Sequence, residues 1–242
     1  MMTEACAPDL SVIVLCYRAG QSASAIVADL QRVLEAGDLA DHQIVLVGNH
    51  RPNDLDDPTP RVVRELTRSD PRIVCSAVEK RGMMGWDLRC GLQLATGRVL
   101  AVIDGDGQIV PEDVVRGYRA LIDTNLDMVQ ARRRSRQDGV RRWLLSRGFN
   151  LLFGLLFPGT GAHDVNGKPK LMTRAAYERL DLRSDDWFID AEILLQARRL
   201  EFRRAEFDTD FLGLAGRRSF VNLRTVAEFV ANLARFRLRG RH

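Results

Sequence analysis

Short apolar runs rich in β-branched residues alternate with helical patterns along the first half of the chain. The runs lie at 11–16 (SVIVLC), 43–48 (QIVLVG), 72–77 (RIVCSA) and 98–104 (RVLAVID). The helical patterns between them extend to about Leu34, over 61–68 and over 85–96. Strands without alternation of apolar and polar residues are typical of a sheet that is covered on both faces. The pattern therefore predicts an α/β fold with a mostly parallel central sheet flanked by helices.

The second half continues this pattern, with a helix expected at about 111–123, a strand at 127–133 and a helix at about 188–200. Hydrophobic residues make up 45% of the chain and charged residues 28%, which excludes a disordered, collagen-like or disulfide-stapled chain. Neither an internal repeat nor a low-complexity linker divides the sequence. We therefore expect one main domain over 1–220, followed by a basic amphipathic helix at 221–242.

Four cysteines stand apart from one another, with no CxxC pair, and we interpret them as reduced thiols of a cytosolic protein. They are Cys6, Cys16, Cys75 and Cys90. The first ten residues lack the basic segment and apolar run of a signal peptide. A run of about 18 apolar residues, which a membrane span would need, does not occur in the sequence. The expected location is therefore cytoplasmic.

The segment Asp104-Gly105-Asp106-Gly107-Gln108 directly follows the fourth predicted strand. Parallel sheets bind ligands at the carboxyl ends of their strands, and glycines leave room for a ligand beside the backbone. Two carboxylates and an amide oxygen suit Mg²⁺ or Mn²⁺, with water and a substrate diphosphate in the remaining positions. The alternative is an Asx-type turn between a strand and a helix that begins at Pro111.

Several motifs in one order resemble the family 2 glycosyltransferases, in particular the branch that contains dolichol-phosphate mannosyltransferase and other polyprenyl-phosphate glycosyltransferases. They are SVIVLCY near the start, GWDLRCGLQLATG (85–97), VLAVIDGDGQ and DVNGKPKLMTR (164–174), and the resemblance covers roughly 10–220. It implies a GT-A-like fold that binds a nucleotide-sugar, with a catalytic domain over 1–220. It also implies that Asp104, Asp106 and Gln108 hold the metal and the donor diphosphate. The donor contacts that it implies are Cys16, Tyr17, Asn49, Gly85 and Asp104.

The chain departs from the family pattern on the donor side. The end of the second strand reads Val47-Gly48-Asn49-His50, where the family carries two acidic residues, one of which reads the nucleobase. Asn49 offers a base edge a different set of donors and acceptors from that of Asp. The family's Gly-Lys-Gly appears here as Gly82-Met83-Met84-Gly85, and Lys80 or Arg81 is left to supply the positive charge.

The resemblance places the acceptor side in the later motifs. It implies that Lys170, within DVNGKPK, contacts an acceptor phosphate together with Arg217, Arg218 and Ser219. A surface turn with solvated lysines is the alternative for that segment. Asp186 is either a catalytic base for a hydroxyl acceptor or a cap of the helix that follows. Asp190 and Glu192 are expected to orient that helix against the sheet.

Two segments indicate contact with a membrane. Residues 143–157 (WLLSRGFNLLFGLLF) are rich in Leu and Phe and follow an arginine-rich stretch, and 221–242 combines an apolar helical face with arginines. Such segments bind anionic membrane surfaces as interfacial helices. Packing on the sheet or a homo-oligomer interface is the alternative for 143–157. Nucleic acid is not an expected partner, because no aromatic-rich RNA-binding motif accompanies the arginines.

The resulting prediction is an inverting, metal-dependent glycosyltransferase that moves a sugar from a nucleotide-diphosphate sugar to a polyprenyl phosphate. It would lie on the inner face of the membrane as a peripheral protein. Two alternatives stay open: the same chemistry with a soluble hydroxyl acceptor, or a catalytically silent module that binds a nucleotide or a lipid phosphate.

Overall fold

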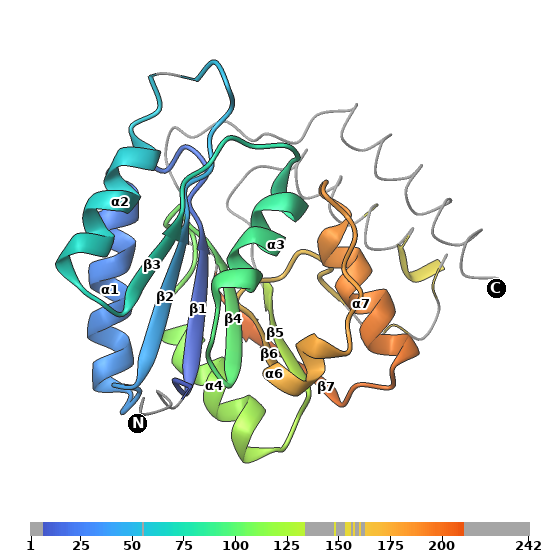
Figure 1. The fold of residues 1–242 in the computed structure, drawn as a ribbon. Coiled ribbons are helices and arrows are strands. Elements are labelled where there is room, and N and C mark those ends of the chain that lie inside the picture. Colours follow the sequence, from blue (N-terminus) through green and yellow to red (C-terminus); the bar gives the residue numbers. More distant parts are fainter. Residues whose placement is uncertain are drawn as a thin grey trace, which may run out of the picture.

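The computed structural model of the chain describes residues 7–54, 56–133, 148, 153–155, 157, 160 and 163–210. These residues contain a seven-stranded sheet in the order β3-β2-β1-β4-β6-β5-β7 (Figure 1). The strands are β1 (Leu10–Leu15), β2 (His42–Val47), β3 (Ile73–Ser76), β4 (Val99–Asp104), β5 (Met128–Arg133), β6 (Lys170–Thr173) and β7 (Arg204–Thr209). The helices are α1 (Ser22–Ala36), α2 (Thr59–Ser69), α3 (Met84–Leu94), α4 (Glu112–Asp123), α6 (Arg174–Glu178) and α7 (Ile189–Arg199).

The first four strands are parallel, as predicted. β1 lies between β2 and β4, and β2 continues to β3 at the edge of the sheet. The carboxyl ends of all four strands therefore lie at one edge, uppermost in Figure 1. The register pairs Leu15 with both Val47 and Asp104, so the three chains leave the sheet at the same level.

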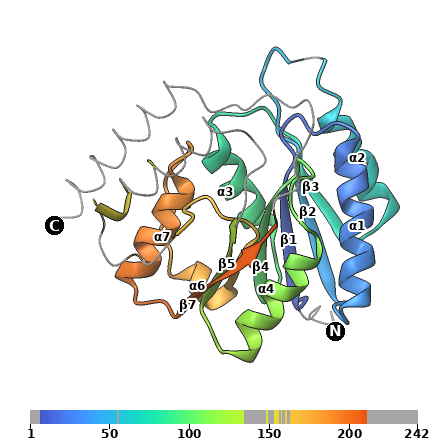
Figure 2. The ribbon, with the colours of Figure 1, turned by 180° about the vertical axis from the view of Figure 1, so that it is seen from behind.

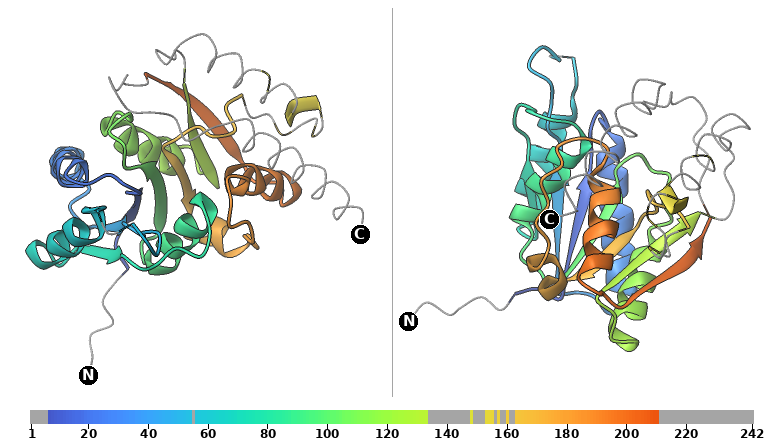
Figure 3. Two further views of the ribbon diagram at one scale, coloured as in Figure 1. Left: turned by 90° about the horizontal axis from the view of Figure 1, so that it is seen from above. Right: turned by 90° about the vertical axis from the view of Figure 1, so that its right-hand side faces the viewer.

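Both faces of the sheet are buried, which explains the continuous apolar runs in the sequence. Side chains of β1 alternate between two cores: Val12 and Val14 pack with α1, α2 and α4, whereas Ile13 packs with α3 and α7. Figure 1 shows α3 and α7 over one face, and Figure 2 shows α1 and α4 from the opposite side. The view from above in Figure 3 shows the sheet between these two layers. The predicted α/β architecture is confirmed.

Two strands were not expected from the sequence. β6 lies between β4 and β5 and is antiparallel to both, while β7 adds to β5 in parallel at the far edge. Four of the six strand pairings are parallel, so the sheet is mostly parallel as predicted. The insertion of β6 brings the segment 164–170 next to β4, and this placement builds the site described below.

The predicted interfacial segments lie largely outside the described residues. The whole of 221–242 is outside them, and 143–157 is described only at 148, 153–155 and 157. Within that stretch, Phe153 and Phe157 are buried with their ring centroids 5.5 Å apart, and they pack in the same core as α3 and α7. These two side chains agree with packing on the sheet. None of the helices in the described part of the chain has the length and apolar character that crossing a bilayer requires.

The contact between α3 and the sheet depends on a glycine. A Cβ at Gly91 would lie 2.5 Å from Cγ2 of Ile13 and 2.8 Å from Cγ2 of Val47. We expect Gly91→Ala to lower the free energy of unfolding by about 1–3 kcal/mol through overpacking, measured by urea denaturation. Gly154→Ala is the control, because no atom lies within 4 Å of its Cβ position. Equal effects of the two substitutions would contradict this packing.

Candidate active site

The turn after β4 brings two predicted metal ligands to the carboxyl edge of the sheet. Gly105 donates its N–H to the Leu15 carbonyl at 2.9 Å, and a Cβ at Gly105 would lie 2.8 Å from that oxygen. The close backbone approach therefore requires glycine. Gly107 has φ of 74°, a left-handed conformation that glycine adopts without strain. The Asp106 carboxylate accepts a hydrogen bond from the Gln108 N–H at 3.1 Å, so the Asx-type turn is present.

Asp104 is contacted by a lysine that the sequence did not assign to the site. Its Oδ1 accepts a hydrogen bond from Nζ of Lys168 at 2.8 Å. The Asp104 side chain is 39% exposed, whereas the Lys168 side chain is only 4% exposed. The ammonium group therefore reaches the carboxylate from inside the protein.

Asp190 forms a buried ion pair with this lysine. The carboxylate of Asp190, in the first turn of α7, lies 2.7 Å from Nζ of Lys170 and 3.5 Å from Nζ of Lys168. All three side chains are almost completely buried. Burial raises the pKa of Asp190, but the charges of Lys168 and Lys170 lower it more, and the net pKa is below its usual range. Burial alone would lower the pKa of Lys168, but the carboxylates of Asp104 and Asp190 raise it by more. The net pKa lies above its usual range, so the lysine stays charged.

A second ion pair fixes the loop that carries these lysines. Arg133, at the end of β5, binds the Asp164 carboxylate through two hydrogen bonds of 2.6 Å and 2.7 Å. Gly167 passes so close to the Ala131 carbonyl that a side chain has no room there. Lys168 and Lys170 are 5% and 0% exposed. The surface turn with solvated lysines, considered above as an alternative, is therefore wrong.

The predicted acceptor-phosphate residues fall in two groups. Lys170 lies in the interior, where its ammonium also donates to the Val165 carbonyl at 3.2 Å. A direct contact with an acceptor phosphate would require Lys170 to leave the Asp190 ion pair, so Lys168 is the lysine that this geometry presents to the site. Arg217, Arg218 and Ser219 lie outside the described residues. Their phosphate contacts stay predictions.

The loop with Asp186 closes onto the amino end of α3. The Gly85 N–H donates to the Asp186 carbonyl at 3.0 Å, and a side chain at Gly85 would collide with this loop. The Asp186 carboxylate accepts from the Phe188 N–H at 2.8 Å, just before α7 begins. Glu192 holds the same loop by accepting from the Ser184 N–H at 2.9 Å. Asp186 thus forms a turn that ends at Phe188, the N-cap residue of α7, but α7 has no side-chain cap hydrogen bond, and the role of Asp186 as a base stays a prediction.

On the donor side, two predicted contacts have buried side chains. The Cys16 thiol is fully buried and donates to the Val14 carbonyl, and burial raises its pKa to about 12. Asn49 is 1% exposed, and its amide donates to Asp87 at 3.0 Å and accepts from the Ser76 hydroxyl at 2.7 Å. In this arrangement the Asn49 amide joins β2, β3 and α3. Contact of these residues with a donor stays a prediction.

The donor side also contains a buried pair that sequence analysis missed. Lys80 and Asp87 form an ion pair whose side chains are 6% and 5% exposed. The Lys80 ammonium also lies 4.1 Å from the centre of the Tyr17 ring. Burial raises the pKa of Asp87 more than Lys80 and Asn49 lower it. Lys80 is one of only three lysines in the chain, and this rarity could have drawn attention to it. Its partner on α3 is not evident from sequence spacing.

The donor set at the end of β4 fits a hard divalent cation. In the described part of the chain, no three His, Cys, Asp or Glu side chains converge as a metal site. The ligands that the sequence predicts are oxygens of Asp104, Asp106 and Gln108, and their contact with a metal stays a prediction. Mg²⁺ is commonly bound in this way, through one or two carboxylates, water and substrate phosphates. Mn²⁺ accepts the same oxygen ligands.

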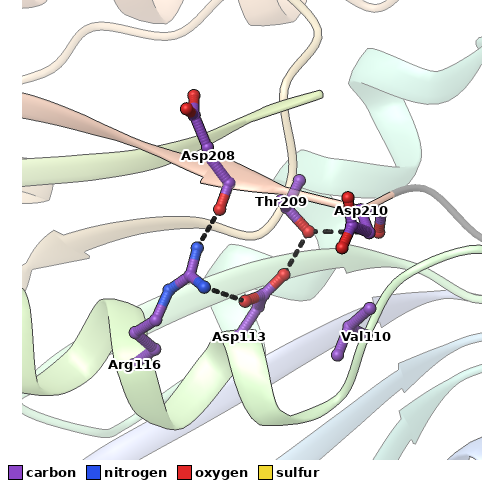
Figure 4. A pocket seen from close by; sticks show the side chains of 6 residues that line it. All are labelled: Val110, Asp113, Arg116, Asp208, Thr209 and Asp210. Atoms are coloured by element: carbon purple, nitrogen blue, oxygen red, sulfur yellow. Dashed lines mark hydrogen bonds and ion pairs between the residues drawn. The ribbon is translucent and has the colours of Figure 1, made fainter. Parts of the chain in front are cut away.

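A separate cavity of about 220 Å³ lies between α4 and the end of β7 (Figure 4). The Thr209 hydroxyl donates to the Asp113 carboxylate, and Arg116 lies 3.3 Å from the same carboxylate. Arg116 also donates to the Asp208 carbonyl. These polar groups satisfy one another and fasten β7 to α4, and none of the site residues named above lines this cavity.

The Asp190 ion pairs give a direct test of the site's construction. Asp190→Asn leaves Lys170 buried without a carboxylate, and breaking a buried ion pair in this way costs about 3–5 kcal/mol of unfolding free energy. The matched control is Asp185→Asn, because the ion pair of Asp185 with Arg89 is 53% and 35% exposed. An exposed pair contributes about 0–1 kcal/mol. Urea denaturation measures both, and similar losses would contradict the assigned role of Asp190.

A family model described as Glycosyl transferase family 2 matches residues 11–181. Glycosyltransferase AglD from Haloferax volcanii is 28% identical over 219 residues, covering 84% of this chain and 33% of that protein. The chain thus spans about a third of the length of this relative.

Solved structures share the fold at lower identity. Mannosyl-3-phosphoglycerate synthase from Rubrobacter xylanophilus has a TM-score of 0.71 at 16% identity, covering 97% of this chain and 76% of that one. The mannosyltransferase PcManGT from Pyrobaculum calidifontis, in complex with GDP-Man and Mn²⁺, has a TM-score of 0.64 at 18% identity, with coverages of 97% and 65%. Glucosyl-3-phosphoglycerate synthase from Mycobacterium tuberculosis, with Mn²⁺, UDP-Glc and phosphoglyceric acid, has a TM-score of 0.68 at 17% identity, with coverages of 95% and 80%.

These likenesses confirm the predicted GT-A-like fold, with a seven-stranded central sheet flanked by helices. The family match covers well over half of the chain and includes the turn after β4. The chain belongs to glycosyl transferase family 2.

Proposed function

We propose that this chain transfers a sugar from a nucleotide-diphosphate sugar to an acceptor, with Mg²⁺ or Mn²⁺ and with inversion at the anomeric carbon. The observation that carries the proposal is the pair Asp104 and Asp106 at the end of β4, in a chain that belongs to glycosyl transferase family 2. The complexes of PcManGT with GDP-Man and Mn²⁺, and of glucosyl-3-phosphoglycerate synthase with UDP-Glc and Mn²⁺, support it.

The residues around this edge have distinct tasks in the proposed reaction. Asp104, Asp106 and Gln108 hold the metal, which when bound neutralises charge on the leaving diphosphate. Tyr17, Asn49 and Gly85 lie at the same edge, on the side where the donor nucleotide is proposed to bind. The loop of Asp186 faces the acceptor, which attacks the anomeric carbon opposite the leaving diphosphate and so gives inversion. A fixed, preorganised charge distribution of this kind lowers the barrier without reorganisation during the reaction.

For the acceptor we propose a polyprenyl phosphate, bound where the chain meets the cytoplasmic face of an anionic membrane. The resemblance to polyprenyl-phosphate glycosyltransferases and the arginine-rich sequences before 143 and after 216 support this choice. A phosphate acceptor is already ionised and needs little help from a base.

A soluble hydroxyl acceptor is the second candidate, because two observations favour it. Lys170 is buried in the Asp190 ion pair, and solved structures of similar fold include synthases named for phosphoglycerate. A hydroxyl acceptor needs a base, and Asp186 is a partly exposed carboxylate on the acceptor loop. A catalytically silent binding module remains the third possibility.

The metal role predicts the behaviour of Asp106→Asn. This variant should lose about 10²–10³-fold in release of nucleoside diphosphate from the donor, because charge on the leaving group is no longer stabilised. A coupled assay with GDP- and UDP-sugars, with Mn²⁺ or with chelator, measures this. Full activity of Asp106→Asn or of wild type in excess chelator would exclude the metal role. Absence of turnover with every donor would favour the silent module.

The acceptor class is tested by Asp186→Asn in transfer assays with a defined polyprenyl phosphate and with 3-phosphoglycerate. If the acceptor is a hydroxyl, the loss of a general base should lower turnover by about 10²–10⁴-fold. If the acceptor is a lipid phosphate, transfer to it should continue within a few-fold. Transfer to phosphoglycerate alone would exclude the polyprenyl proposal.

Membrane association is tested by flotation with vesicles. The chain should float with vesicles rich in anionic lipid at low salt and should dissociate at high salt, because each arginine near such a surface contributes about 1 kcal/mol. Neutral vesicles are the control. If the chain does not float with anionic vesicles at low salt, the membrane proposal is wrong, and packing on the sheet or self-association explains that apolar segment.

A further inference from the structure

The ammonium of Lys168 lies between two carboxylates and is closer to that of Asp104 than to that of Asp190. It is 2.8 Å from Oδ1 of Asp104 and 3.5 Å from Oδ2 of Asp190. That second oxygen is buried, and among the described residues its one contact with a cation is this long ion pair with Lys168, with no shorter hydrogen bond. Lys168 thus makes its shorter contact with the exposed carboxylate and a longer one with the buried carboxylate.

Three other cations near this edge, within the described residues, have carboxylate partners of their own. Lys170 is bonded to Oδ1 of Asp190, and Arg133 is bonded to Asp164 through two nitrogens. Lys80 is paired with Asp87 on the donor side. Of the three lysines in the chain, Lys168 is the one that contacts Asp104.

This arrangement opposes a free divalent cation at Asp104. Such a cation would share the carboxylate with an ammonium held in place by burial, and the two positive charges repel each other. A donor diphosphate supplies negative charge that compensates the added cation. Oδ2 of Asp190, already 3.5 Å away, gives Lys168 a second partner when the cation takes Asp104.

We propose that Lys168 is a positioning residue that makes binding of a divalent cation at Asp104 depend on the donor diphosphate. The inference rests on the proposed function. In the donor-free site, Lys168 neutralises Asp104 and weakens binding of the cation. When cation and diphosphate bind together, the ammonium moves toward Oδ2 of Asp190 and releases Asp104 to the cation.

Calorimetry of the full chain tests the proposal with Mn²⁺ as the probe. Mn²⁺ is titrated into wild type and Lys168→Met, first alone and then with saturating GDP or UDP. In wild type the nucleoside diphosphate should tighten Mn²⁺ binding by about tenfold or more, within the usual range of coupling between two ligands. In Lys168→Met, Mn²⁺ alone should bind several-fold tighter than to wild type. The nucleoside diphosphate should then change the Mn²⁺ affinity of this variant by no more than about twofold.

Two further variants keep the result interpretable. Lys168→Gln repeats the charge removal with a polar side chain, in case Lys168→Met does not fold. Arg119→Met, on an exposed part of α4, removes one positive charge away from the site and should keep the wild-type coupling.

Three outcomes would overturn the inference. Unchanged coupling in both Lys168 variants would mean that Lys168 only stabilises the fold. Weaker binding of the nucleoside diphosphate with unchanged coupling would make Lys168 a direct ligand of the diphosphate. If wild type fails to bind Mn²⁺ even in the presence of GDP or of UDP, the proposed function itself fails, and the inference fails with it.

Discussion

The buried carboxylate of Asp190 connects the elements that surround the site. Asp190 belongs to the first turn of α7, Lys170 begins β6, and Lys168 precedes β6 and contacts Asp104 at the end of β4. Without Asp190, β6 would carry an unpaired ammonium between β4 and β5. Because unpaired buried charge is strongly unfavourable, this carboxylate fixes α7 against β6 and, through Lys168, against the end of β4.

The same interaction sets the charge of the site. Three carboxylates and three cations pair across the end of the sheet, so that their charges cancel before any ligand binds. They are Asp104, Asp164 and Asp190, with Arg133, Lys168 and Lys170. Asp106 adds one negative charge at the turn. A divalent cation would leave this group net positive, and the diphosphate of a nucleotide-sugar offsets that excess. Charge balance thus favours joint binding of metal and donor.

The early half of the fold was predictable from sequence because its signals are local. Strands such as Val99–Asp104 are buried on both faces and therefore read as apolar runs, and the carboxylates follow directly after the last of them. β6 and β7 were missed for physical reasons. β6 is four residues long and begins with a lysine, and β7 (RAEFDT) is a charged edge strand. Both form through pairing with distant segments.

The site was predicted only in part for a related reason. The residues of one turn, Asp104 to Gln108, were identified because they are adjacent in sequence. The partners Lys168 and Asp190 are separated by 22 positions and meet only because β6 inserts beside β4. The sequence of this segment predicted a phosphate contact for Lys170, with a solvated turn as the alternative, and neither anticipated burial, since a buried lysine is rare unless it is paired. Burial of both lysines became evident only in three dimensions.

The most direct test of this account is a crystal structure of the chain with Mn²⁺ and a nucleoside diphosphate, with the metal located by its anomalous scattering. We expect one Mn²⁺ at the end of β4, coordinated by carboxylate oxygens of Asp104 and Asp106 and by the diphosphate. Lys170 should remain paired with Asp190. Mn²⁺ and diphosphate bound away from the end of β4, with Asp104 still paired to Lys168, would contradict the account.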